Sequence, residues 1–279
     1  MTKLPSEIMS PFIMLIEDLY TAPEAQRDLL IKELFEKGQQ CYEEMKSLDN
    51  DFMDLRKKNI ELEEKIQSLY ENLDKQRASM DPRDFEYHKE RCKDKYNEVW
   101  SQLDSDSQEF LVTAHYILYK IRSQKRDFSP VIIEFCRVFE NELQKKIFDG
   151  YMKSLMEKEP PIIDNDSAYN KINIALSDNR KKGCYFLSSS DMIKCLGTLR
   201  HISPSRSGYN HDMRSYLSTR NWDISALSNI DFENSAQRYI DKYRNEAAHP
   251  NMMDEVVANR CADKTRTVVR WFLSSKRHV

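Results

Sequence analysis

The spacing of apolar residues predicts a chain built from helices. Apolar positions recur every three or four residues along most of the sequence, and no convincing stretch alternates with the period of two that marks a β-strand. We expect helices over 10–20, 22–78, 82–103, 105–124, 130–157, 167–177, 190–202, 211–219, 231–248 and 252–275. Proline stands near the start of several of these segments, where the first helical turn does not need its N–H group.

The helix expected over 22–78 carries a seven-residue repeat. With Ile31 at heptad position a, six successive d positions hold Leu or Cys: Leu34, Cys41, Leu48, Leu55, Leu62 and Leu69. A strict seven-residue repeat is typical of a coiled coil, because a single straight helix drifts away from it. Asn59 is the one polar residue at an a position. Two such side chains can pair across a parallel dimer and fix the register of its helices.

Two arrangements satisfy this repeat. Either two copies of the chain pair as a homodimer, or the helix over 82–103 folds back over the seam as an internal hairpin. Gly38 and Phe52 make the seam irregular, and this favours the dimer. We therefore expect an all-α protein with a helical, coiled-coil region over 1–103 and a helical bundle over 104–279.

Two apolar stripes mark the core of that bundle. Their spacings of three and four place each stripe on one face of a helix. The stripe of the helix over 130–157 consists of Ile132, Phe135, Cys136, Phe139, Leu143 and Ile147, and that of the last helix of Val257, Cys261, Val268 and Phe272.

Composition narrows the class of protein. Only 5 of 279 residues are glycine, and neither G-x-G-x-x-G nor G-x-x-x-x-G-K-[ST] occurs, which argues against Rossmann and P-loop nucleotide sites. The sequence contains no run of 18 apolar residues, so we expect no membrane span. The first residues also lack a signal-peptide pattern. The six cysteines form no C-x-x-C pair, so we expect reduced thiols and a cytoplasmic protein.

The charge distribution and the spacing of possible metal ligands give little evidence about the function. Residues 161–279 hold 18 Lys or Arg against 13 Asp or Glu, whereas the rest holds 25 against 33. This mildly basic part would tolerate a polyanion, although a chance distribution of surface charges explains it equally well.

The sequence has no H-E-x-x-H motif and no Cys/His cluster with zinc spacing, so we expect neither a metal nor a cofactor. His115, on the apolar helix over 105–124, fits a hydrogen-bonded, half-buried histidine.

One constellation has the chemistry of RNA cleavage. Arg244 and His249 lie five residues apart, and Pro250 favours a helix end at His249, which lets the imidazole ring turn toward Arg244. Histidine can take the proton of a 2′-hydroxyl or supply one to the leaving 5′-oxygen. Arginine can stabilise the charge that develops on the phosphorane oxygens, and no metal is needed. The alternative is an ordinary helix C-terminus with a basic residue near its end.

The same residues resemble the R-x(4–6)-H motif of the HEPN superfamily, including the polar residue after the arginine, Asn245. The order of the helical segments over about 104–276 is also similar to that of bacterial HEPN-like proteins, whereas the N-terminal coiled coil lies outside the resemblance. The resemblance implies an all-α bundle that dimerises so that two motifs meet in one cleft. It also implies that Arg244 stabilises the phosphorane and that His249 acts as acid or base. Asn245 would orient the histidine or the phosphate, and Glu140 either orients Arg244 or forms a simple surface ion pair.

What the resemblance implies for function is a metal-independent endoribonuclease acting in anti-phage defence or as a toxin. The expected partners are RNA, a second copy of the chain in a homodimer or higher oligomer, and a protein of the same defence system. The alternative is a non-catalytic HEPN-fold module in which the coiled coil docks a partner effector.

Overall fold

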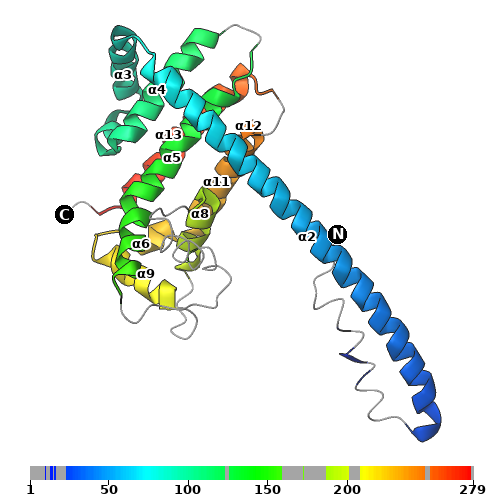
Figure 1. The fold of residues 1–279 in the computed structure, drawn as a ribbon. Coiled ribbons are helices and arrows are strands. Elements are labelled where there is room, and N and C mark those ends of the chain that lie inside the picture. The colour runs from blue at the N-terminus through cyan, green and yellow to red at the C-terminus, as the bar shows by residue number, and fades with distance from the viewer. Residues whose placement is uncertain are drawn as a thin grey trace. The chain divides into compact units, whose positions relative to one another are not determined.

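Helices make up the described part of the protein. The computed structural model describes residues 10, 13–14, 16, 23–122, 126–158, 172, 187–200, 208–248 and 252–277. Within these residues every named element is a helix, and the one pairing of extended backbone is an isolated bridge between Trp222 and Lys276. The expectation of an all-α protein, with a long N-terminal helix and a helical bundle, is confirmed (Figure 1). The chain divides into two units, Met1–Glu64 and Lys65–Val279.

The first unit consists, where it is described, mainly of the helix α2 (Glu24–Ala78) up to Glu64. Among its heptad positions Cys41 is buried, whereas Ile31, Met45 and Leu55 are 52%, 44% and 60% exposed. Asn59 lies within α2, but its side chain is outside the described residues. The heptad seam of this unit therefore presents large apolar side chains to solvent.

The second unit begins with the last turns of α2 and continues through α3 (Pro82–Tyr96) and the 3₁₀ turn η1 (Asn97–Gln102). Leu73 of α2 and Cys92 of α3 belong to the same buried core as the helices that follow. The sequence predicts a boundary between residues 103 and 104, whereas the structure divides the chain between Glu64 and Lys65. The reason is packing: apolar residues over 66–103 are buried in the bundle core.

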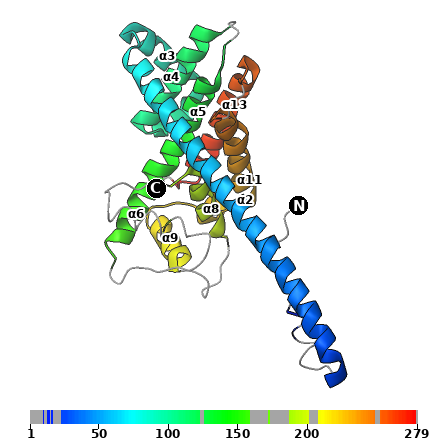
Figure 2. The same cartoon turned by 45° about the vertical axis from the view of Figure 1, so that its right-hand side comes forward.

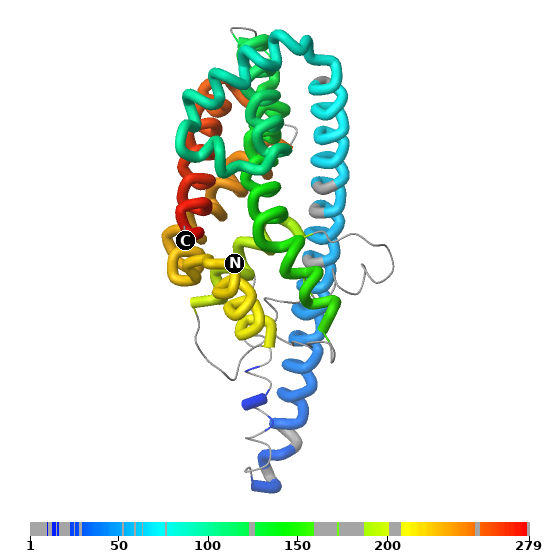
Figure 3. The backbone as a smooth tube through the Cα atoms, turned by 90° about the vertical axis from the view of Figure 1, so that its left-hand side faces the viewer, coloured from blue at the N-terminus to red at the C-terminus, as the bar shows by residue number. Residues whose placement is uncertain are grey.

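The centre of the bundle is α5 (Ser129–Leu143), which packs against α4 (Ser105–Ile121) and α13 (Glu255–Ser274), as Figures 1 and 3 show. The stripe predicted for the helix over 130–157 is confirmed as core, because its six residues have no exposed surface: five lie in α5, and Ile147 lies in the π-helical turn η2 (Gln144–Phe148) that follows it. Phe139 contributes edge-to-face contacts with Phe232, Tyr239 and Phe272, with ring centroids 6.5, 6.1 and 6.2 Å away. Such contacts add to the stabilisation from burial alone.

Shorter helices complete the bundle. α8 (Ser189–Thr198) and α11 (Ile230–Tyr239) pack side by side (Figure 2), and α9 (Gly208–Ser218) precedes the short α10 (Ile224–Leu227). The sequence analysis did not predict α10, because four residues are too few to show a helical period. Asp223 caps α10 by accepting a hydrogen bond from the Ala226 N–H.

Some expectations fall outside the described residues. The helix expected over 167–177 lies almost entirely outside the described residues, and the helix expected over 10–20 lies outside them in large part. The five described cysteines are buried and form no disulfide, while Cys184 is not among the described residues. None of the described helices has both the length and the apolar character needed to cross a membrane.

Candidate functional site

The candidate arginine lies where α11 changes its helical winding. α11 continues into a π-helical turn, η4 (Ile240–Asn245), and then into α12 (Glu246–Ala248). Such a turn inserts one residue into the helix and is frequent at functional sites. In and beside this turn, residues that are adjacent in the sequence are buried together, as Tyr243 and Arg244 are. As a result the Arg244 side chain points inward and is only 5% exposed.

Arg244 is held by a carboxylate from the central helix. Its Nε lies 2.6 Å from Oε1 of Glu140 on α5, and the Glu140 side chain is 16% exposed. Of the two roles considered for Glu140, a surface ion pair would leave both partners solvated. This pair is largely buried, so the carboxylate fixes the orientation of the guanidinium.

Glu140 is in turn held by two hydroxyl groups. Tyr70 near the end of α2 and Ser189 at the start of α8 both donate hydrogen bonds to its carboxylate. Burial, and next the charge of Glu140, raise the pKa of Tyr70, so its hydroxyl keeps its proton and acts as a donor. Four elements therefore converge on one ion pair. The sequence alone does not point to Tyr70 and Ser189, because neither residue stands in a motif and only the packing of α2 and α8 brings them to Glu140.

Asn245 connects the arginine to the surface of its own helix. Its Oδ1 accepts a hydrogen bond from an Arg244 Nη group at 3.5 Å, and its Nδ2 donates to Asp241 at 3.2 Å. Asp241 also accepts from Gln237 at 2.9 Å. The polar side chain after the arginine thus helps to fix Arg244 and its helix.

The predicted partner of Arg244 lies just past this helix. His249 and Pro250 are outside the described residues, and α12 ends at Ala248, directly before them. The structure therefore brings together Arg244, Asn245 and Glu140. The expected meeting of Arg244 with His249 stays a prediction.

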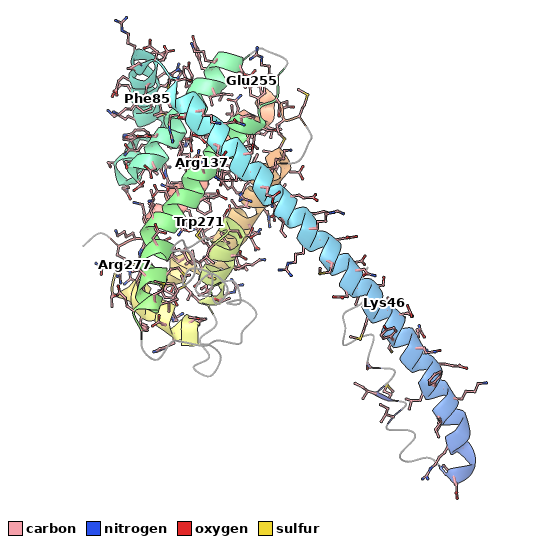
Figure 4. The ribbon with its side chains drawn as sticks, viewed as in Figure 1. Lys46, Phe85, Arg137, Glu255, Trp271 and Arg277 are labelled. Carbon is pink, nitrogen blue, oxygen red and sulfur yellow. The ribbon has the colours of Figure 1, made fainter. Side chains whose placement is uncertain are left out.

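A second buried ion pair lies beside the first on α5. Arg137 contacts Glu134 at 3.1 Å and Asp74 at 2.9 Å, and its guanidinium lies over the rings of Tyr70 and Phe110 at 4.4 and 4.1 Å. Glu134 has no exposed side-chain surface, and this burial raises its pKa to about 7. Arg137, which Figure 4 labels on α5, thus ties the last turns of α2 to the bundle.

A cavity of about 270 Å³ adjoins both ion pairs. Arg137, Glu140, Tyr70 and Ser189 are among the residues that line it, but Arg244 is not. A ligand in this cavity would meet Glu140 but not Arg244. Within the described residues no group of three or more His, Cys, Asp or Glu side chains could hold a metal ion.

His115 is half-buried, as the sequence predicts, but its hydrogen bonding differs from the expectation. Its ring is packed against Phe135 and Tyr96, with centroids 5.1 and 6.1 Å away, and burial lowers its pKa to about 3. The expectation of a hydrogen-bonded histidine is wrong for Nε2, which is buried and has no hydrogen-bond partner among the described residues.

Comparisons of the chain with protein-family models, with curated proteins and with solved structures found no match.

Proposed function

We propose that the protein is a cytoplasmic, metal-independent endoribonuclease of the HEPN type that acts in anti-phage defence or as a toxin. The observation that carries this proposal is the positioned guanidinium of Arg244. It is fixed by Glu140 and Asn245 at a π-helical turn, five residues before His249. A cation that is oriented in advance stabilises a developing negative charge without the cost of reorganisation.

The reaction uses two side chains and no metal. His249 removes the proton of a 2′-hydroxyl, and the 2′-oxygen attacks the adjacent phosphorus. The bond from phosphorus to the 5′-oxygen breaks, and a protonated histidine supplies the proton to that oxygen. Arg244 stabilises the charge on the phosphorane oxygens. The products are a 2′,3′-cyclic phosphate and a 5′-hydroxyl, and RNA is the substrate class.

The heptad seam supports pairing with a second copy of the chain. The a positions near the end of α2, Ile66 and Leu73, are buried within the chain. Ile31, Met45 and Leu55 lie beyond the reach of a helix over 82–103 that folds back after α2, and they are between 44% and 60% exposed. Apolar side chains at these positions are stabilised when they pack into the facing helix of a coiled coil. A homodimer formed in this way brings two Arg244 and His249 sets into one assembly.

The dimer can be tested by sedimentation. Leu55→Lys places a charge at a d position, and we expect it to shift the protein from dimer to monomer. Met53→Lys is the matched control, because Met53 is similarly exposed (54%) but occupies position b, outside the seam. A monomeric parent, or equal behaviour of the two variants, would contradict the proposed pairing.

The activity is tested on RNA in the presence of EDTA. We expect the parent to cleave total RNA and to leave ends with cyclic phosphate. His249→Ala should reduce the rate about 10²–10⁴-fold, and Arg244→Ala about 10²–10³-fold. His211→Ala and Arg238→Ala are matched controls, since both residues are exposed and lie outside the ion-pair network of Arg244. Cleavage that is absent, or equal in all variants, would overturn the proposal.

The second candidate is a non-catalytic module whose coiled coil docks a partner effector of a defence system. The specific observation in its favour is the low exposure of Arg244, since a guanidinium that is 5% exposed and paired with a carboxylate serves stability without any substrate. Under this alternative the purified parent leaves RNA intact. A variant such as Leu55→Lys would then lose the partner while the bundle remains folded.

A further inference from the structure

A cavity at the end of the bundle away from α9 is lined by cations. It measures about 300 Å³ and lies among α3, α4 and the first turns of α13. Figure 4 labels Phe85 on α3 and Glu255 on α13, which mark this end of the bundle. The volume is at the lower limit of small-molecule sites, which run from about 300 to 1,000 Å³.

Three cationic side chains line the cavity: Arg91, Lys95 and Arg122. Within the described residues neither Arg91 nor Lys95 forms an ion pair, and no carboxylate that lines the cavity faces them directly. Arg122 pairs with Glu255 at 3.2 Å, and Glu255 is the only carboxylate among the described lining residues. Burial lowers the pKa of Lys95, which means that the surrounding protein solvates its ammonium group poorly. An anion in the cavity would therefore relieve an unfavourable concentration of positive charge.

Other acids near the cavity offset this charge only in part. Asp84 is paired with Lys120 at 3.3 Å. Asp263 acts on Lys95 more strongly than the opposing charge of Arg266, but it does not line the cavity. Cys92 also lines the cavity, but burial raises its pKa to about 12, so it stays a thiol and offers no negative charge.

The wall of the cavity contains a buried nitrogen. His115 lines the cavity, and its Nε2 lacks a hydrogen-bond partner among the described residues. A buried polar atom without a partner costs about 1–3 kcal/mol. Because Nε2 is buried beneath the cavity surface, His115 contributes to the wall of the cavity and does not donate a hydrogen bond to a ligand.

Aromatic rings border the same cations. The His88 ring contacts the rings of Tyr87, Tyr116 and Tyr119, with centroids 5.2, 5.6 and 5.5 Å away. Tyr119 lines the cavity and is 58% exposed, so it offers a ring to a flat ligand. Aromatic rings beside basic side chains are the combination that binds bases by stacking and phosphates by charge.

We infer that this cavity binds a nucleoside phosphate, with the phosphate on Arg91 and Lys95 and the base on Tyr119. The site is separate from the Arg244 and Glu140 pair and does not rest on the proposed ribonuclease activity.

Isothermal titration calorimetry with AMP, inorganic phosphate and adenosine tests this site. We expect AMP to bind more tightly than inorganic phosphate, and adenosine to bind at least tenfold more weakly than AMP. Undetectable binding of AMP at millimolar concentration would overturn the inference. So would an affinity for adenosine equal to that for AMP, because the cations would then contribute nothing. Equal affinities for AMP and inorganic phosphate would overturn the assignment of the base.

Variants distinguish binding of AMP in the cavity from unspecific attraction of an anion to a positively charged surface. Arg91→Gln and Lys95→Gln should each weaken AMP binding at least tenfold. Lys93→Gln is the matched control, because Lys93 lies on the same helix, is paired with Glu90 and does not line the cavity. Tyr119→Leu should weaken AMP binding fivefold or more and leave phosphate binding unchanged. An equal loss in Lys93→Gln, or a Tyr119 variant that binds AMP like the parent, would contradict the inference. Far-UV circular dichroism verifies that each variant is folded.

Discussion

Replacing Glu140 with glutamine tests whether this carboxylate holds Arg244. The change keeps the shape of the side chain and one acceptor oxygen but removes the negative charge. Arg244 is then left as a cation whose side chain is 5% exposed and lacks its counter-charge. Breaking a buried pair in this way costs about 3–5 kcal/mol. Since the amide oxygen can still accept one hydrogen bond, we expect a loss near the lower limit, about 3 kcal/mol.

The loss is measured by urea unfolding followed through tryptophan fluorescence. The three tryptophans, Trp100, Trp222 and Trp271, all belong to the unit Lys65–Val279, so the signal reports the bundle and not the rest of α2. In a unit of this size, a loss of about 3 kcal/mol corresponds to a fall in Tm of roughly 6–12 °C.

A double-mutant cycle isolates the pair. Arg244→Met removes the cation, and in that background Glu140→Gln should cost little, because no buried charge is left without a partner. We expect a coupling energy of nearly 3 kcal/mol between the two sites, since about 3 kcal/mol is lost in the parent and little in the Arg244→Met background. Glu86→Gln is the control, since Glu86 pairs with Lys89 on the surface and should cost less than about 1 kcal/mol. Additive losses in the cycle, or a Glu140→Gln variant as stable as the parent, would refute this reasoning.

Three further predictions concern the bundle. Phe139→Ala should lower the free energy of unfolding by about 3–5 kcal/mol in the same urea assay, because the ring is fully buried against three other aromatic rings. Asp254→Ala should cost about 1 kcal/mol, measured in the same way, because its side chain caps α13 by accepting from the Val257 N–H at 2.8 Å. Stability should fall as the pH drops below 6.5, since burial lowers the pKa of His115 to about 3 and the unfolded chain binds the proton more readily. Between pH 6.5 and pH 5 this amounts to about 2 kcal/mol, and His115→Gln should remove that part of the pH dependence in parallel urea titrations.

For the Phe139 and Asp254 predictions, a conservative variant serves as the comparison. Phe139→Leu should lose less than the alanine variant, and Asp254→Asn should keep most of the cap, since asparagine also accepts from the helix N-terminus. A Phe139→Ala variant within 1 kcal/mol of the parent would contradict the described core, and equal losses for Ala and Asn at 254 would contradict the cap. The same pH dependence in the parent and in His115→Gln would show that other groups govern it.

The helices and the core could be predicted from the sequence because both depend on local order. The stripe of α5 needs only the repeat of 3.6 residues per turn, and all of its predicted residues are buried. The ends of helices were predictable where a cap or a proline marks them, as at Asp81. The π-helical turn at Arg244 was not predictable, because no pattern of residue types distinguishes it from the α-helix on either side.

The sequence by itself determined an all-α chain, a long heptad-bearing helix and an arginine that stands out by its spacing from a histidine. Only the tertiary structure decided what surrounds that arginine. Glu140 meets Arg244, and Tyr70 and Ser189 meet Glu140, although all three are far from Arg244 in the sequence, because three other helices pack at one point. The same holds for the cationic cavity, where Arg91 and His115 come from separate helices. Periodicity encodes which face of a helix is buried, but which polar groups meet across buried faces depends on how the helices cross.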